Sequence, residues 1–249
     1  MYSIRQETMR DYIEDKNVVT IKQLQALFPD VSLMTIHRDL DALEKAGAVV
    51  KFRGGAKSVR HAADVEFNIR MQANTPGKHL IARKAKDLLQ PHSAIFLDAS
   101  TTNLALAKEL PDMNLNIFTT GPSIALELCR LHNPVVTLCC GTMNRKNLAL
   151  SGQNTLRMLE NINIDMAFIG VSGCSVDAGF TCGTEADMLV KKMVIQKART
   201  SVLMCGKDKL SCLMPYTFAR LSDADYLITD GELSESFLKA AENANLKIL

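Results

Sequence analysis

Apolar and polar residues alternate along the first part of the chain with the three-to-four-residue period of amphipathic helices. Ser3 and Thr20 each stand three positions before a glutamine, which is the spacing of a capping box, so each predicts the start of a helix. The Pro-Asp pair at 29–30 ends the second helix and turns the chain. A third helix is expected to begin after Ser32 and to end at Gly47.

The third helix has two distinct faces. At ~100° per residue, Ile36, Leu40 and Leu43 share one stripe, which predicts the face that packs on the core. The residues that point outward in the first turn and a half are then Met34, Thr35, His37 and Arg38. Residues 48–57 follow, with apolar residues and cations around two glycines, and this pattern predicts a β-hairpin.

Two short helices joined by a tight turn, with hydrogen-bonding groups exposed at the start of the second, fit the major groove of DNA. A basic hairpin directly after that helix is a wing, whose cations neutralise phosphates without reading sequence. Each feature alone is also compatible with a solvated helix face or an ordinary turn, but their order favours a winged helix-turn-helix. The predicted groove contacts are Thr35, His37 and Arg38, and the predicted phosphate contacts are Lys51, Arg53 and Lys57.

A larger α/β domain is expected to follow this N-terminal domain of residues 1–57. A polar linker at 58–77, with the breaker Asn-Thr-Pro-Gly at its end, leads into a domain at 78–249 that opens with a helix at 78–89. Short apolar runs then alternate with helical stretches, which predicts a mainly parallel sheet whose strands are buried on both faces. The runs lie at 94–100, 116–121, 135–141, 166–173, 201–209 and 225–230, and the helical stretches at 103–110, 123–131, 155–161 and 185–199.

Polar residues follow the apolar runs, at the edge where open parallel sheets bind ligands. Hydroxyls and amides at the head of the helix after Thr102 would suit a phosphate, and Asp98 could accept hydrogen bonds from sugar hydroxyls. The alternative is that each serine or threonine only caps the next helix. The residues concerned are Asp98, Ser100, Thr101, Thr102, Thr119, Thr120, Gly121, Gly141 and Lys209.

The composition excludes some classes of protein. The 249 residues contain no apolar run of the ~18 residues that a membrane span needs, and the start does not resemble a signal peptide, so a cytoplasmic protein is expected. A net charge of +2 neither demands nor excludes nucleic acid as a partner. The seven cysteines form no CxxC pair, which favours buried thiols over disulfides or a zinc site, and no metal or other cofactor is predicted.

The segment VSLMTIHRDLDALEKAGAVVKFRGGA at 31–56 closely resembles the winged-helix signature of DeoR-family transcriptional regulators. That signature runs approximately VS-x-x-TIRRDL-x-x-LE-x-x-G and is followed by a hairpin ending in HGGA. His37 replaces the first arginine of the family pattern, and Arg53 stands where its histidine usually is. Because histidine lacks the bidentate fork that arginine offers to guanine, the base preference of the family does not transfer to this chain.

The resemblance extends over the larger domain, where LDASTT, DMAFIG and LITD look like the D-x-G-T-T loop, the D-x-AFIG strand and the late strand end of the family. It implies a sensor domain of the sugar-phosphate isomerase/CoA-transferase-like fold, with a sugar phosphate or related metabolite as effector. It also implies that Lys192 binds the effector together with the polar residues named above. Ser100 replaces the usual glycine, and Gly206 stands where the D-S-S-K pattern has its acidic residue.

Catalysis is not expected. Isomerases with this resemblance carry an acidic segment that reads Gly-Val-Ser-Gly-Cys at 170–174 here, without a carboxylate to act as base. The resulting hypothesis is a repressor of a carbohydrate operon that binds operator DNA as a homodimer or homotetramer. The alternatives are a sugar-phosphate isomerase-like enzyme with an appended winged helix, and a winged helix that binds protein.

Overall fold

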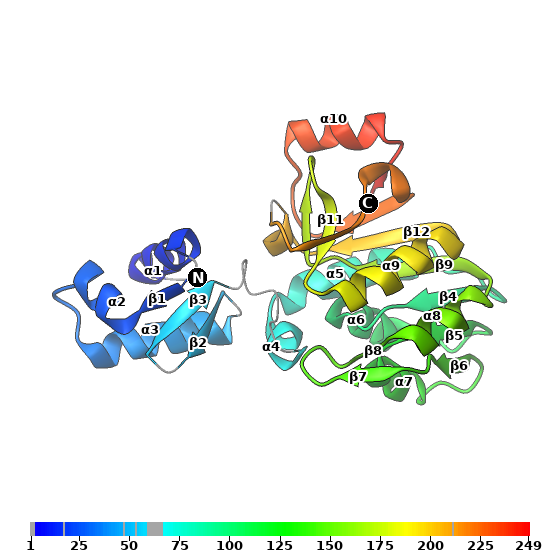
Figure 1. The fold of residues 1–249 in the computed structure, drawn as a ribbon, viewed down its shortest axis with the longest axis horizontal. Helices are drawn as coiled ribbons and strands as arrows, with labels where there is room; N and C mark the ends of the chain where they lie inside the picture. The colour runs from blue at the N-terminus through cyan, green and yellow to red at the C-terminus, as the bar shows by residue number, and fades with distance from the viewer. Residues whose placement is uncertain (1–2, 17, 47, 53, 59–66, 211) are drawn as a thin grey trace. The chain divides into compact units, whose positions relative to one another are not determined.

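The computed structural model describes residues 3–16, 18–46, 48–52, 54–58, 67–210 and 212–249 (Figure 1). The chain divides into two compact units, an N-terminal unit of Met1–Thr75 and a C-terminal unit of Pro76–Leu249. Predicted residues Gly47 and Arg53 lie outside the described residues, as does the side chain of Lys57.

The N-terminal unit contains the three predicted helices and the predicted hairpin. The helices are α1 (Ile4–Lys16), α2 (Ile21–Leu27) and α3 (Leu33–Lys45), and the hairpin is β2 (Val49–Phe52) with β3 (Gly55–Ser58). Both capping boxes are confirmed, because the Ser3 and Thr20 hydroxyls accept from the backbone of the glutamines three positions later. The sequence missed the short strand β1 (Val18–Thr20), which pairs with β3 and completes an antiparallel sheet of order β1-β3-β2.

The core of this unit forms where the apolar stripe of α3 meets α1, α2 and the sheet. Ile36, Leu40 and Leu43 are fully buried, as the pattern predicted, and they cluster with Met9 of α1 and Leu24 of α2. Burial of such side chains contributes roughly 1.5–3 kcal/mol each relative to exposure. This packing fixes which side of α3 faces solvent.

Two helices follow, and one of them begins earlier than the sequence predicted. They are α4 (Phe67–Gln72) and α5 (Thr75–Lys86). Asn74 makes the break between them with a positive φ of 45°. Pro76 was expected to keep the chain non-helical, but it lies in the first turn of α5, where its missing N–H leaves no hydrogen bond unmade.

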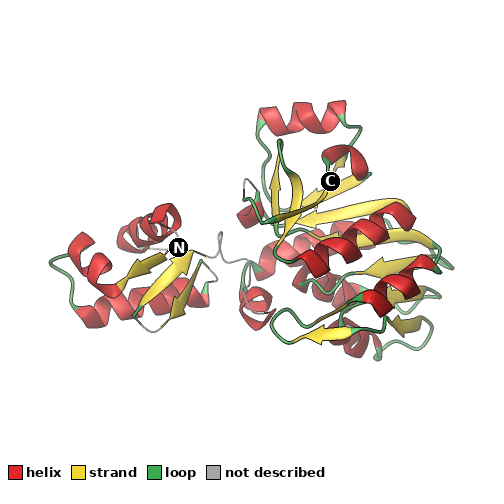
Figure 2. Cartoon of the chain, in the orientation of Figure 1, coloured by secondary structure: helices red, strands yellow, loops and turns green. Residues whose placement is uncertain are grey.

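The C-terminal unit is built on a seven-stranded sheet in which every pairing is parallel. The predicted apolar runs form β4, β5, β6, β9, β12 and β14, and the helices between them alternate with the strands (Figure 2). The strands are β4 (Ala94–Leu97), β5 (Asn116–Thr119), β6 (Val135–Leu138), β9 (Ile164–Gly170), β12 (Ala198–Cys205), β14 (Tyr226–Thr229) and β15 (Lys247–Ile248). The helices are α6 (Thr101–Glu109), α7 (Pro122–Leu128), α8 (Gln153–Glu160), α9 (Glu185–Lys197) and α10 (Glu235–Asn243).

The strand order β15-β14-β12-β9-β4-β5-β6 reverses direction at the centre of the sheet. From β4 the chain adds β5 and β6 on one side, and it then returns to add β9 and the later strands on the other. The point between β4 and β9, where the order reverses, is the topological switch point of the sheet. The fold thus places the segment after β4 where ligands bind in open α/β sheets.

Smaller elements surround the sheet. A three-stranded antiparallel sheet joins β10 (Gly173–Ser175), β11 (Gly179–Cys182) and β13 (Tyr216–Ala219), and a hairpin joins β7 (Thr142–Asn144) to β8 (Ala149–Ser151). The sequence predicted none of these strands, because three or four residues are too few to show a period. Two 3₁₀ turns, η1 (Lys207–Lys209) and η2 (Leu221–Asp223), follow β12 and β13.

Candidate functional site

The start of α3 is fixed by its cap. The hydroxyl of Ser32 accepts a hydrogen bond from the Thr35 backbone N–H at 3.2 Å, and it lies 2.9 Å from the Thr35 hydroxyl. The Thr35 side chain, predicted to contact DNA, is therefore already bonded within the helix cap. The first turn of α3 is held in place without any contribution from Arg38 or His37.

The outward face of α3 carries the other predicted groove residues. Arg38 is exposed and His37 is half-buried, while the core stripe lies on the opposite side of the helix. The neighbouring Asp39 is buried, and its two oxygens accept from Arg5 Nε at 2.5 Å and from Gln6 Nε2 at 3.1 Å. Because Asp39 points toward α1, its negative charge is withdrawn from the face that carries Arg38.

The hairpin is anchored to the second half of α3. Gly54 turns it with a φ of 103°, a conformation that L side chains rarely adopt. Near this turn, the backbone N–H of Lys51 donates to Glu44 at 2.7 Å, and the Lys51 ammonium binds the carboxylate of Asp41. Lys51, predicted to contact phosphate, thus pairs with an acidic group of its own chain.

At the carboxyl edge of the parallel sheet, Asp98 is the centre of a buried network. One of its oxygens accepts from the Asn103 amide at 2.7 Å and from the Ser100 N–H at 3.1 Å. The other accepts from the Gly170 N–H at 3.0 Å and from the Lys191 ammonium at 2.5 Å. Four donors satisfy the carboxylate, which corrects the expectation that Asp98 is available to sugar hydroxyls.

The lysine at this network is Lys191, whereas the sequence predicted Lys192. Lys191 is buried and also donates to the Gly170 carbonyl at 2.6 Å, with Asp187 at 3.6 Å and the Phe218 ring centre at 5.3 Å from its nitrogen. Lys192 is exposed, because successive residues of a helix point about 100° apart. The family resemblance had pointed to the neighbouring residue instead.

Opposing effects set the ionisation of this pair. Burial by itself would raise the pKa of Asp98, but the charge of Lys191 and the hydrogen bonds outweigh it, so the pKa is lowered. Burial would likewise lower the pKa of Lys191, yet the charges of Asp187 and Asp98 raise it above its ordinary value. Both groups are therefore charged at neutral pH, and they join the ends of β4 and β9 to α9.

The loops after β4 and β5 lie against each other. The Ser100 hydroxyl caps α6 by accepting from the Asn103 N–H at 3.1 Å. The Ser100 side chain also leaves no room for a side chain at Gly170, because a Cβ there would lie 2.3 Å from the Ser100 Cβ. A Cβ at Gly121 would lie 3.1 Å from the Cα of Ala99 in the first loop. These close approaches bring the predicted residues of both loops to one place.

The remaining predicted effector residues occupy varied environments. Thr101, Thr119 and Thr120 are buried, and the Thr119 hydroxyl accepts from the Gly121 N–H at 3.0 Å. Thr102 is half-buried at the start of α6. Lys209 is also half-buried, in η1 after β12, and β12 lies two strands from β4 in the sheet. Gly141 is exposed, and a Cβ there would meet the Thr155 side chain at 2.2 Å, so its conformation serves the contact with α8.

Sequence reasoning missed Asn103. Its amide nitrogen donates both to Asp98 and to the Phe168 carbonyl at 2.7 Å, and this arrangement fixes the orientation of the amide. The amide oxygen is buried and has no hydrogen-bond partner among the described residues. The available signal was an asparagine three positions after a serine cap, directly before the apolar run of residues 104–107.

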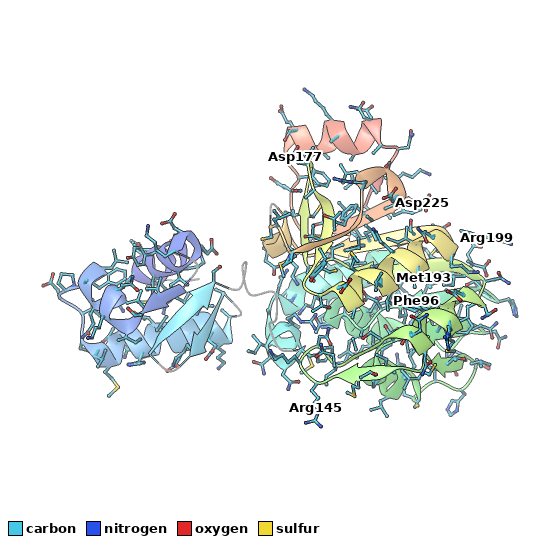
Figure 3. The ribbon with its side chains drawn as sticks, in the orientation of Figure 1. Phe96, Arg145, Asp177, Met193, Arg199 and Asp225 are labelled. Atoms are coloured by element: carbon cyan, nitrogen blue, oxygen red, sulfur yellow. The ribbon has the colours of Figure 1, made fainter. Side chains whose placement is uncertain are left out.

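An open pocket of about 400 Å³ lies at the other end of the strands. It is lined by residues at the amino ends of β4, β9 and β12, among them His92, Asp165 and Arg199. Figure 3 shows Arg199 at the surface of the C-terminal unit, where its side chain is 85% exposed. This open cavity does not include Asp98, so we place the candidate site at the switch point on chemical grounds.

Among the described residues, no three histidine, cysteine or acidic side chains are grouped to hold a metal ion. No helix within the described ranges is long and apolar enough to cross a membrane.

A winged helix-turn-helix followed by a parallel α/β domain with a polar switch-point edge defines a DNA-binding regulator with a small-molecule sensor domain. Residues 5–62 match the model of the DeoR-like helix-turn-helix domain, and residues 73–231 match that of the DeoR C terminal sensor domain. The chain belongs to the DeoR family of transcriptional regulators.

Similar proteins include other regulators over nearly their whole length. The HTH-type transcriptional regulator GolR of Listeria innocua is 30% identical, with 98% of this chain and 96% of that protein covered. The repressor GlcR of Bacillus subtilis is 30% identical, with 96% and 92% covered, and the L-fucose operon activator of Escherichia coli is 26% identical, with 92% and 96% covered. A solved ribose 5-phosphate isomerase from Methanocaldococcus jannaschii gives a TM-score of 0.42 at 16% identity over 55% of each chain.

Proposed function

We propose that this regulator represses a carbohydrate operon and that a sugar phosphate or a related phosphorylated metabolite sets its affinity for operator DNA. The observation that carries the DNA-binding part is the first half of α3, which is capped, anchored on one face and exposed on the other around Arg38. The name of GlcR supports repression, whereas the L-fucose operon activator shows that relatives can act in the other direction.

Arg38 is the main candidate for a base contact. It is exposed on the outward face of α3, and Thr35 and His37 flank it. A good base contact by arginine contributes roughly 1–3 kcal/mol of discrimination. Arg53 and Lys57 are proposed to contact phosphates. Lys51 could also contact a phosphate, but its ion pair with Asp41 would first have to break.

The effector is proposed to bind at the switch point of the sheet, beside the loops that follow β4 and β9. The start of α6 offers backbone N–H groups and the hydroxyls of Thr101 and Thr102, which suit a phosphate group. Asp98 and Lys191 act by holding these loops, and the unpartnered oxygen of Asn103 would favour a donor such as a hydroxyl or a water. The other proposed effector contacts are Ser100, Thr119, Thr120, Gly121, Gly141 and Lys209.

A purely regulatory role is proposed in preference to isomerisation. A sugar-phosphate isomerase needs a carboxylate that can take a proton from the substrate. Residues 170–174 contain none, and Asp98 is a poor base because four donors surround it and its pKa is lowered. The chemistry of this edge thus favours binding over turnover.

Two or four copies are proposed to act together, because one helix-turn-helix unit contacts only one half-site. The test begins with selection of binding sequences from a pool of random duplexes by the full-length protein. A panel of sugar phosphates is then added to the selected complex, and fluorescence anisotropy reports release or tighter binding. Failure of every phosphorylated sugar to change the affinity would reject the proposed effector class, and conversion of an added aldose phosphate to a ketose would favour the enzyme.

A further inference from the structure

Met34 is an apolar side chain exposed where a helix surface is ordinarily polar. Its side chain is 79% exposed in the first turn of α3, all of whose residues the structure describes. It is therefore not part of the core, which Ile36, Leu40 and Leu43 form on the opposite side of the helix. At ~100° per residue, Met34 and Arg38 occupy the centre of the outward face, with Thr35 and His37 at its borders.

The chemistry of the major groove offers one partner for such a side chain. Base edges present hydrogen-bond donors and acceptors, and the C5-methyl group of thymine is the apolar exception. A methionine is flexible and polarisable, so it can adapt to a methyl group without strict geometry. Phosphates and sugars offer a thioether no comparable contact.

We propose that Met34 packs on the C5-methyl group of a thymine and so reads one base of each half-site. This inference rests on the proposed DNA-binding function. Met34 lies four residues before Arg38, which corresponds to about 6 Å along the helix axis. Since base pairs are stacked about 3.4 Å apart, the thymine is expected within about two base pairs of the base that Arg38 contacts.

The test uses the full-length protein and the duplex that it selects from a random pool. Each thymine of that duplex is replaced in turn by deoxyuridine, which lacks only the methyl group. Loss of one buried methyl should weaken binding by the wild type roughly three- to fivefold at one position per half-site. Met34→Ala should bind more weakly than the wild type and should lose this discrimination between thymine and uracil, whereas Met34→Leu should retain it.

Ile4→Ala is the matched control. Ile4 is 85% exposed on α1 of the same unit, so its removal deletes an exposed apolar side chain that does not belong to α3. This variant should discriminate against uracil as the wild type does. A Met34→Ala protein that keeps the uracil penalty, or a wild type that is indifferent to uracil at every position, overturns the inference alone. If the wild type selects no sequence at all, the DNA-binding function itself fails, and with it this inference.

Discussion

At the scale of single residues, the sensor unit depends on a buried ion pair that joins three elements. Asp98 after β4 binds Lys191 of α9, and both contact the backbone of Gly170 at the end of β9. Burying two charges costs solvation energy, which the mutual attraction and the additional hydrogen bonds offset. Removing one partner leaves the other charge buried and unpaired.

Lys191→Met is therefore expected to lower the free energy of unfolding of the C-terminal unit by roughly 3–5 kcal/mol. Lys192→Met removes the same charge from the next residue, which is exposed, and it should change the stability by less than about 0.5 kcal/mol. Urea unfolding of the full-length proteins, followed by circular dichroism, measures both. Equal losses for the two variants would contradict the assignment of Lys191 to the network.

The pair also predicts a pH dependence. The pKa of Asp98 is lower in the folded state, so its contribution to stability is complete above the unfolded value of about 3.9 and is lost as the pH falls through the folded value. The pKa of Lys191 is raised, so its contribution is lost only as the pH rises through its folded value, above about 10.4. The stability advantage of wild type over Asp98→Asn should stay constant down to about pH 5 and should shrink as the pH falls below about 4. An advantage that stays constant below about pH 4 would contradict a lowered pKa of Asp98.

At the scale of elements, the hairpin and α3 are linked through an acidic side chain. The exposed carboxylate of Asp41 binds the Lys51 ammonium, and Glu44 binds the Lys51 backbone N–H. These contacts orient the hairpin beside the helix that is proposed to enter the groove. The Asp41 carboxylate also repels DNA phosphates, and it pairs with the Lys51 ammonium, which could otherwise bind a phosphate.

Asp41→Asn should consequently bind DNA more tightly, by a fewfold for all sequences alike, and should show a steeper salt dependence by about one unit of slope. Asp11→Asn is the control, since Asp11 also pairs with a cation of the N-terminal unit, Arg10 on α1. Anisotropy titrations at several salt concentrations distinguish the two variants. Weaker binding by Asp41→Asn would mean that the orientation of the hairpin matters more than the freed charge.

The elements that could be predicted from the sequence are those with local signals. The caps at Ser3, Thr20 and Ser32 and the apolar runs of the parallel sheet depend on neighbouring residues, and the structure contains each of them. The short strands β1 and β13 were missed, because each pairs with a strand far away in the chain, β1 with β3 and β13 with β11. The hairpin of β10 and β11 was missed because its strands are too short to show a period.

The candidate site was predicted in outline only. Asp98 and Ser100 were predicted because they directly follow an apolar run, and the fold places them at the switch point. The family resemblance pointed to Lys192, and a shift of one residue along a helix turns a side chain by about 100°, so it missed Lys191. The unpartnered oxygen of Asn103 depends on its contact with Phe168, sixty-five positions away, which no local pattern reveals.

At the scale of the whole molecule, the proposed DNA contacts belong to the N-terminal unit and the proposed effector contacts to the C-terminal unit. Regulation therefore requires that the effector bind with different affinity to the DNA-bound and the free protein, and the coupling free energy is the same in both directions. A coupling of roughly 1–3 kcal/mol would change operator affinity about 5- to 150-fold.

The central claim is that the start of α3 reads DNA, and the most direct measurement is the affinity of three proteins for a selected duplex and for a random one. The proteins are the wild type, Arg38→Ala and Lys45→Ala, whose lysine is exposed in the last turn of the same helix. The wild type should prefer the selected duplex, Arg38→Ala should lose roughly 1–3 kcal/mol of that preference, and Lys45→Ala should keep it. An unchanged preference in Arg38→Ala, or wild-type binding that does not weaken with salt, would contradict the claim.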